Sequence, residues 1–218
     1  MNIFKFNFQL PKISESIKTI VSSPTIIITL LAIIALGAVI LYIAKVKITT
    51  RILVHVALAI AIGTVLKMFR IMEMPMGGSV TLGSMVPIIF ISYLYGPRVG
   101  CFAGIVFGIM DLLLGAYVVH PIQLILDYIL AFGSLGFAGY FKNNIIIGAL
   151  SAITLRFICA VISGIVFFAS YAGGKNVFIY SILYNGTYLL PEAIITIIIL
   201  LSLSLPLKRI KSEIMKNS

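Results

Sequence analysis

The feature that most constrains this chain is a run of twenty uncharged residues from Thr25 to Ala44. A helix of about 20 apolar residues crosses the roughly 30 Å hydrocarbon core of a bilayer. Further long apolar stretches follow at 52–70, 79–95, 99–115, 121–141, 145–172 and 179–205. The whole chain of 218 residues is 61% hydrophobic and 10% charged, a composition that excludes ordinary soluble and disordered proteins. The sequence therefore predicts an all-α integral membrane protein without space for a soluble catalytic domain.

Composition along the chain divides it into four parts. Residues 1–24 mix lysines with phenylalanines and predict an amphipathic segment at the membrane interface. Residues 25–46 form the first predicted transmembrane helix, which begins too late and runs too long for a cleavable signal peptide. Residues 50–207 carry six predicted helices, and residues 208–218 form a basic tail.

The net charge of +10 reflects basic residues at the ends of apolar stretches, where they contact lipid headgroups. No basic face with interleaved aromatic residues is present, which argues against a nucleic-acid partner. The positive-inside rule assigns the side with more lysine and arginine to the cytoplasm of a plasma-membrane protein. That side holds Lys45, Lys47, Arg51, Arg98, Lys142, Lys208, Arg209, Lys211 and Lys216. We therefore expect a cytoplasmic C-terminus, an external N-terminus, and a site that opens to the exterior.

Four ionisable residues within the apolar stretches are candidates for function: Asp111, Asp127, Arg156 and Glu192. Charged groups in the bilayer are costly and are usually paired or functional. One alternative is structural, with Asp111 paired to Arg156. Lys67 is expected to extend its charge to the outer interface. Asp111 and Asp127 lie on different predicted helices, and neither clustered aspartates nor a metal motif indicates a membrane enzyme.

Small and aromatic residues recur at helical spacing. Gly100, Gly104 and Gly108 form a stripe that predicts close helix packing. Polar and aromatic residues also share faces on the last three predicted helices, with Gln123 four residues before Asp127. The outer third of these helices collects Tyr117, Asp127, Tyr128, Tyr171, Tyr180 and Asn185. Aromatic faces attract cations and carboxylates neutralise them, so this cluster suits a small, flat, cationic ligand, although lipid-facing tyrosines are the alternative.

Five segments carry a family resemblance: MPMGGSVTLGSMVP (74–87), YGPRVGCFAG (95–104), LDYILAFGSLGFAG (126–139), ISGIVFFASYA (162–172) and YSILYNGTYLLPE (180–192). Together they resemble the thiamine-specific substrate-binding subunits, or S components, of energy-coupling factor transporters. The resemblance covers about residues 50–207 and implies a six-helix core, so that the helix at 25–46 is an addition.

The resemblance implies thiamine as ligand, with no cofactor and no catalytic activity in this chain. It also implies three partner subunits, namely one transmembrane coupling protein and two ATPases. The sequence has no phosphate-binding loop of its own, which agrees with separate ATPases. Docking on the coupling protein would use small residues of the first core helix, matched here by Ala57 and Ala61.

The family's ligand-binding positions correspond to tyrosines, an acid and an amide of this chain: Tyr117, Asp127, Tyr128, Tyr180 and Asn185. The resemblance assigns polar contacts with the aminopyrimidine to Asp127 and Asn185, and stacking around the thiazolium to the aromatic rings. Gly77 and Gly78 would allow the outer loop to approach the ligand closely.

Three positions depart from the family pattern. Asp127 stands in place of glutamate, Ala160 in place of histidine, and Phe168 in place of a stacking tryptophan, in a chain that contains no tryptophan. A phenyl ring attracts a cation less strongly than indole does, and Tyr171 is available as a substitute. These changes leave open a ligand other than thiamine, such as its pyrimidine or thiazole precursor or another vitamin.

Overall fold

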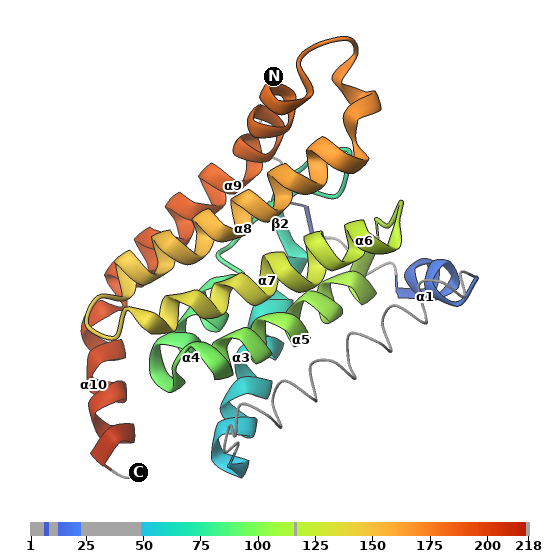
Figure 1. The fold of residues 1–218 in the computed structure, drawn as a ribbon. Coiled ribbons are helices and arrows are strands. Elements are labelled where there is room, and N and C mark those ends of the chain that lie inside the picture. The colour runs from blue at the N-terminus through green and yellow to red at the C-terminus, as the bar shows by residue number, and fades with distance from the viewer. Residues whose placement is uncertain (1–6, 9–12, 23–48, 116, 217–218) are drawn as a thin grey trace.

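The computed structural model describes residues 7–8, 13–22, 49–115 and 117–216. The predicted helix at 25–46 lies outside the described residues, as does most of segment 1–12. Five described helices are long and apolar enough to cross a membrane: α3 (Thr50–Met68), α5 (Pro97–Gly115), the helix Pro121–Tyr140, α8 (Ile145–Phe167) and α9 (Val177–Ser202). They form one elongated bundle, in which α8 and α9 lie side by side (Figure 1). The prediction of a helical, multi-pass membrane protein is confirmed.

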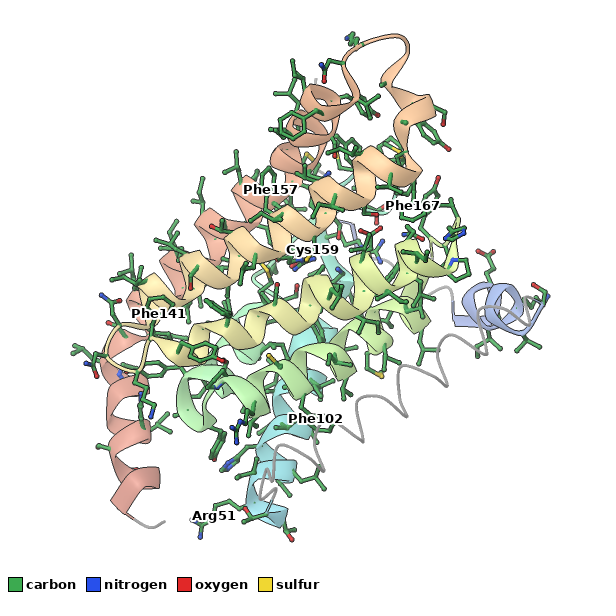
Figure 2. All side chains as sticks on the ribbon, in the orientation of Figure 1. Arg51, Phe102, Phe141, Phe157, Cys159 and Phe167 are labelled. Atoms are coloured by element: carbon green, nitrogen blue, oxygen red, sulfur yellow. The ribbon has the colours of Figure 1, made fainter. Side chains whose placement is uncertain are left out.

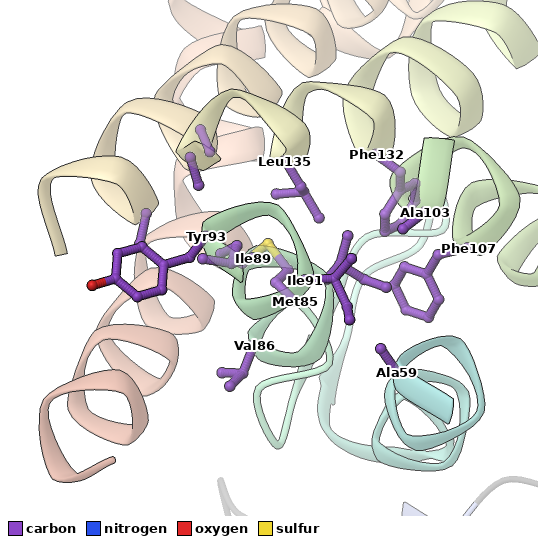
Figure 3. Close-up of a cluster of buried hydrophobic side chains, with 14 of the residues drawn as sticks. Ala59, Met85, Val86, Ile89, Ile91, Tyr93, Ala103, Phe107, Phe132 and Leu135 are labelled. Carbon is purple, nitrogen blue, oxygen red and sulfur yellow. The ribbon is translucent and has the colours of Figure 1, made fainter. Parts of the chain in front are cut away.

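The second core helix is shorter than predicted. Helix α4 covers Val86–Tyr95 instead of 79–95, and its ten residues rise about 15 Å, half of the hydrocarbon core. Ile88 and Ile89 on this helix are fully buried, together with Phe107 of α5 and Phe132 of the 121–140 helix (Figure 3). Helix α4 is apolar on all sides because the other helices surround it.

A small antiparallel sheet interrupts the expected all-helical fold. Its strands β1 (Asn7–Phe8), β2 (Phe69–Glu73) and β3 (Ser79–Thr81) pair in that order. The prediction that helices include residues 69–70 and 79–85 is therefore wrong. Gly77 and Gly83 adopt positive φ angles of 90° and 82°, which a helix does not accommodate. We refer to residues 69–81 as the hairpin.

The 121–140 helix changes its winding along its length. It begins as α6 (Pro121–Leu124), widens to the π-helical η1 (Ile125–Leu130), returns to α7 (Ala131–Gly133) and tightens to the 3₁₀ segment η2 (Ser134–Tyr140). Its backbone lies directly against the glycines of α5. A Cβ atom on Gly104 would overlap the Phe132 carbonyl, and one on Gly108 would overlap the Tyr128 carbonyl. The predicted close packing of this stripe is confirmed.

The helices at the chain ends complete the molecule. Helix α1 (Ile13–Ser22) packs against α5, and its described side chains are exposed. After Phe168, a short 3₁₀ turn, η3 (Ala169–Ala172), ends the predicted 145–172 helix early. The C-terminal tail is itself a helix, α10 (Ser204–Lys216), in which Lys211 lies 3.6 Å above the Tyr93 ring centroid. Apolar side chains project outward along α8 and α9, as in a lipid-facing surface (Figure 2).

Candidate binding site

A cavity opens between the hairpin, the loop at Tyr117 and the outer halves of the 121–140 helix, α8 and α9. Its volume is about 750 Å³, including the open mouth. Sites for small molecules and cofactors combine apolar walls with a few placed polar groups. The lining of this cavity has that character, because aromatic rings alternate with a few polar and charged side chains.

The structure brings eight of the nine predicted ligand-binding residues to this cavity: Gly77, Gly78, Tyr117, Asp127, Tyr128, Phe168, Tyr180 and Asn185. The ninth, Tyr171, does not line it. The Tyr171 side chain is 54% exposed, and its hydroxyl lies 3.4 Å from the Tyr117 hydroxyl. Tyr171 thus supports the wall from behind, because its ring packs at 6.1 Å against the ring of Phe168.

Asp127 is the acid that the π-helical segment directs into the cavity. Its Oδ2 atom accepts hydrogen bonds from Gln123 Nε2 at 2.6 Å and from Ser163 Oγ at 2.9 Å. Single π-helical turns within α-helices occur frequently at functional sites, since they turn side chains out of the regular register. Two neutral donors therefore fix the Asp127 carboxylate, while no described cation lies within ion-pair distance of it.

The loop before this helix is held by side chains of the helix itself. Gln123 Nε2 donates to the Tyr117 carbonyl at 3.2 Å, and the Tyr117 amide donates to the Tyr128 hydroxyl at 3.0 Å. The hydrogen bond with Tyr171, together with burial, raises the pKa of Tyr117 to about 12. The Tyr117 ring packs at 6.1 Å against the ring of Phe168.

Asn185 connects α9 to α8. Its Nδ2 atom donates to the Ala160 carbonyl at 3.2 Å and to the Ser181 carbonyl at 2.9 Å. Its Oδ1 atom accepts from the Tyr188 hydroxyl at 2.7 Å. The amide donors are thus used within the protein, and the second lone pair of Oδ1 is the group that Asn185 has left for a ligand.

The floor of the cavity carries charges in a different arrangement from the predicted one. Lys67 forms an ion pair with Asp111 at 3.0 Å, and only 8% of the Lys67 side chain is exposed. Arg156 instead lies 4.1 Å above the ring centroid of Phe132. The predictions that Asp111 pairs with Arg156 and that Lys67 reaches the interface are therefore wrong. Helix α3 ends at Met68, which leaves Lys67 facing α5 inside the bundle.

Glu192 lies outside the cavity and holds the base of the hairpin. Its carboxylate accepts hydrogen bonds from the Thr81 amide and from Thr81 Oγ1, with Ser84 Oγ at 3.4 Å. Glu192 is 2% exposed, so these bonds replace the water that the carboxylate would otherwise bind. Glu192, the last of the four ionisable candidates, therefore has a structural role in holding the hairpin.

Sequence reasoning missed several residues of the cavity. Tyr184 and Phe132 were not singled out, and Lys67 was expected elsewhere, yet all three line the site. The spacing of Tyr180, Tyr184 and Tyr188 at four-residue intervals was the available signal for Tyr184. No comparable signal marks Lys67, because its position depends on where α3 ends.

The two alanines expected to dock on a partner lie far from the buried face of their helix. Val56, Ala59, Gly63 and Lys67 form the buried face of α3, whereas Ala57 and Ala61 are exposed. The small-residue pair is thus available on the outer surface of the bundle.

Comparison with known proteins identifies the family. Residues 53–212 match the family model described as thiamine transporter protein (Thia_YuaJ). The chain belongs to this family. The chain is 38% identical to the thiamine transporter ThiT of Bacillus subtilis over 168 residues, which cover 69% of this chain and 86% of that protein.

Two further relatives support the same family assignment. It is 31% identical to ThiT of Lacticaseibacillus paracasei over 140 residues, which cover 53% of this chain and 68% of the relative. The structure of ThiT from Listeria monocytogenes superposes with a TM-score of 0.64 at 27% identity, covering 72% of this chain and 96% of that one. This Thia_YuaJ member is accordingly a membrane transport protein and not an enzyme.

Proposed function

We propose that this protein captures thiamine at the outer face of the plasma membrane, as the substrate-binding subunit of an energy-coupling factor transporter. One observation carries the proposal: in a chain of the thiamine transporter family, the carboxylate of Asp127, which forms no ion pair with a described cation, lines a cavity walled by aromatic rings. Thiamine is a cation with two planar aromatic rings and an amino group that can donate hydrogen bonds. A carboxylate and aromatic faces complement these properties.

In the proposed complex, Asp127 accepts a hydrogen bond from the aminopyrimidine, and Asn185 offers the remaining lone pair of Oδ1. Phe168, Tyr117 and Tyr180 provide ring faces near the thiazolium. Gly77 and Gly78 let the hairpin cover the ligand, since Gly77 has a φ of 90° and a Cβ on it would lie 3.2 Å from the Tyr117 Cβ. Tyr128 acts indirectly, by holding the Tyr117 amide.

A second candidate ligand is the isolated pyrimidine or thiazole moiety of thiamine. It is favoured by Ala160 and Phe168, which leave this wall without the histidine and the tryptophan that the family resemblance implies. A neutral pyrimidine needs the carboxylate but does not need a ring that attracts a cation.

The partners we propose are a transmembrane coupling protein and two ATPases that energise uptake. The exposed Ala57 and Ala61 on α3 are the proposed docking surface, because small residues let helices approach closely. We place the basic C-terminal helix α10 in the cytoplasm and the N-terminus outside, with residues 50–207 as the vitamin-binding core, 1–24 at the interface and 25–46 as an added membrane helix.

Calorimetry on detergent-purified protein tests the ligand, with thiamine, its phosphate esters, and the separate pyrimidine and thiazole moieties. We expect tight binding of thiamine and a loss of about 10-fold to 100-fold for Asp127→Asn, because a charge-assisted hydrogen bond contributes about 1.5–3 kcal/mol. Glu213→Gln is the matched control, since Glu213 is an exposed carboxylate on α10. Undiminished binding by Asp127→Asn would refute the proposed role, and binding of one moiety alone would favour the second candidate.

A further inference from the structure

Three tyrosines form a column along the cavity side of α9. Tyr180, Tyr184 and Tyr188 follow one another at intervals of four residues, and all three line the cavity. The ring centroids of Tyr180 and Tyr184 lie 6.2 Å apart with an interplanar angle of 22°. Those of Tyr184 and Tyr188 lie 6.0 Å apart at 68°. The column is thus a continuous aromatic wall, of which only Tyr180 corresponds to a site position implied by the family resemblance.

Tyr184 and Tyr188, the two inner tyrosines of the column, also contact the hairpin. The Tyr184 hydroxyl accepts a hydrogen bond from the Met76 amide at 3.1 Å. A Cβ atom on Gly78 would lie 2.6 Å from Cδ1 of Tyr188, so the hairpin backbone rests directly on that ring. The turn of the hairpin therefore rests on the rings of the tyrosine column at Met76 and Gly78.

The column is held in place from behind. The Tyr188 hydroxyl donates to Asn185 Oδ1, and Asn185 is anchored to the Ala160 carbonyl of α8. Both inner tyrosines are partly buried, and both line the cavity that also contains Asp127. Rigid rings that need little reordering are favourable for binding, because few side-chain rotamers are lost.

We propose that Tyr184 and Tyr188 are ligand-contacting residues that form the cation-attracting wall of the site and transmit ligand occupancy to the hairpin. The inference rests on the proposed function, since it takes the ligand to be the thiazolium cation of thiamine. It explains how a cavity without tryptophan and with Ala160 at its α8 wall retains enough aromatic surface. Asn185 is then a positioning residue for Tyr188.

The test compares thiamine with its uncharged isostere, in which a thiophene replaces the thiazolium. Tyr184→Leu should weaken thiamine binding about tenfold and change binding of the thiophene isostere less than about threefold, because cation–π attraction requires both the ring and the charge. Tyr140→Leu is the matched control, since Tyr140 is 65% exposed on η2 and packs against Phe137 outside the cavity. Its affinities should equal those of the unmodified protein.

Ring electronics provide a second variant that preserves shape and folding. Replacement of Tyr184 by phenylalanine analogues with increasing fluorine content should lower thiamine affinity stepwise, while affinity for the thiophene isostere stays constant. Tyr184→Phe should keep thiamine affinity within about threefold but speed hydrogen exchange at the Met76 amide, whose acceptor is lost.

The outcomes separate this inference from the proposed function. Equal losses for both ligands, or none for either, would overturn the role of Tyr184 while leaving thiamine capture intact. Failure of the folded, unmodified protein to bind thiamine would overturn the proposed function and the inference with it.

Discussion

The seam between α5 and the 121–140 helix and the wall between α8 and α9 are both helix contacts, yet they are built differently. The seam is made of glycines whose Cα atoms meet backbone carbonyls, as at Gly104 and Gly108. The wall around the cavity is made of partly buried tyrosines of α9 and of buried, hydrogen-bonded polar groups such as Ser181 and Asn185. The comparison teaches that the same bundle is closed where small residues let backbones touch, and open where the hairpin, the 121–140 helix, α8 and α9 surround a cavity lined by large rings.

This difference has a physical cause. In lipid, helices gain little by burying apolar surface against one another, so close van der Waals packing supplies much of their association. A ligand site needs the opposite, namely space and polar groups that a ligand can satisfy. The glycine seam carries the helix that presents Asp127, which places the closed region directly behind the binding region.

Gly108→Ala is the change most able to break the seam. A Cβ at this position would overlap the Tyr128 carbonyl, and backbone cannot move aside as a side chain can. We expect destabilisation above the usual range of about 1–3 kcal/mol for overpacking, with loss of ligand binding. Thermal unfolding in detergent measures this effect. Gly186→Ala is the control, because its new methyl group would meet only Leu190 at 3.8 Å, and it should be neutral or slightly stabilising.

The Lys67–Asp111 ion pair at the cavity floor extends the comparison to a buried charged contact, which does not belong to the glycine seam. Lys67→Met would leave Asp111 without its ion-pair partner, and such a loss costs about 3–5 kcal/mol. The double variant Lys67→Met with Asp111→Leu should recover most of that stability. Chemical denaturation of the single and double variants measures the coupling. Equal stability of the two would show that an unpaired Asp111 carries no cost in this site.

The base of the hairpin should show a smaller effect. Thr81→Val removes one hydrogen bond to the buried Glu192 and should lower stability by about 1–2 kcal/mol. Thr196→Val is the matched control, because Thr196 is a buried threonine one helical turn after Glu192 on α9. Within the described part of the chain the Thr196 hydroxyl has no hydrogen-bond partner, so its removal should be neutral or stabilising. A comparison of melting temperatures decides between them, and similar losses would contradict the role of Glu192.

The sequence predicted well those features that depend on one property, such as the hydropathy of a segment or the spacing of two residues along a helix. The apolar stretches located α5, α8 and α9 to within a few residues, except where α8 ends at Phe167. The four-residue spacing of Gln123 and Asp127 anticipated their hydrogen bond at 2.6 Å. The hairpin was missed because hydropathy does not distinguish a buried strand from a helix, and Val80 is buried at 3% exposure.

The sequence by itself determined that this chain enters a membrane as a helical bundle, since hydropathy and length dictate which segments the bilayer accepts. It also determined the family, through motifs whose order spans most of the chain. Only the tertiary structure decided that Lys67 pairs with Asp111, that Glu192 holds Thr81, and that Tyr184 meets Met76. These contacts join residues 44 to 111 positions apart, and their partners follow from where helices end and cross, which local spacing does not encode.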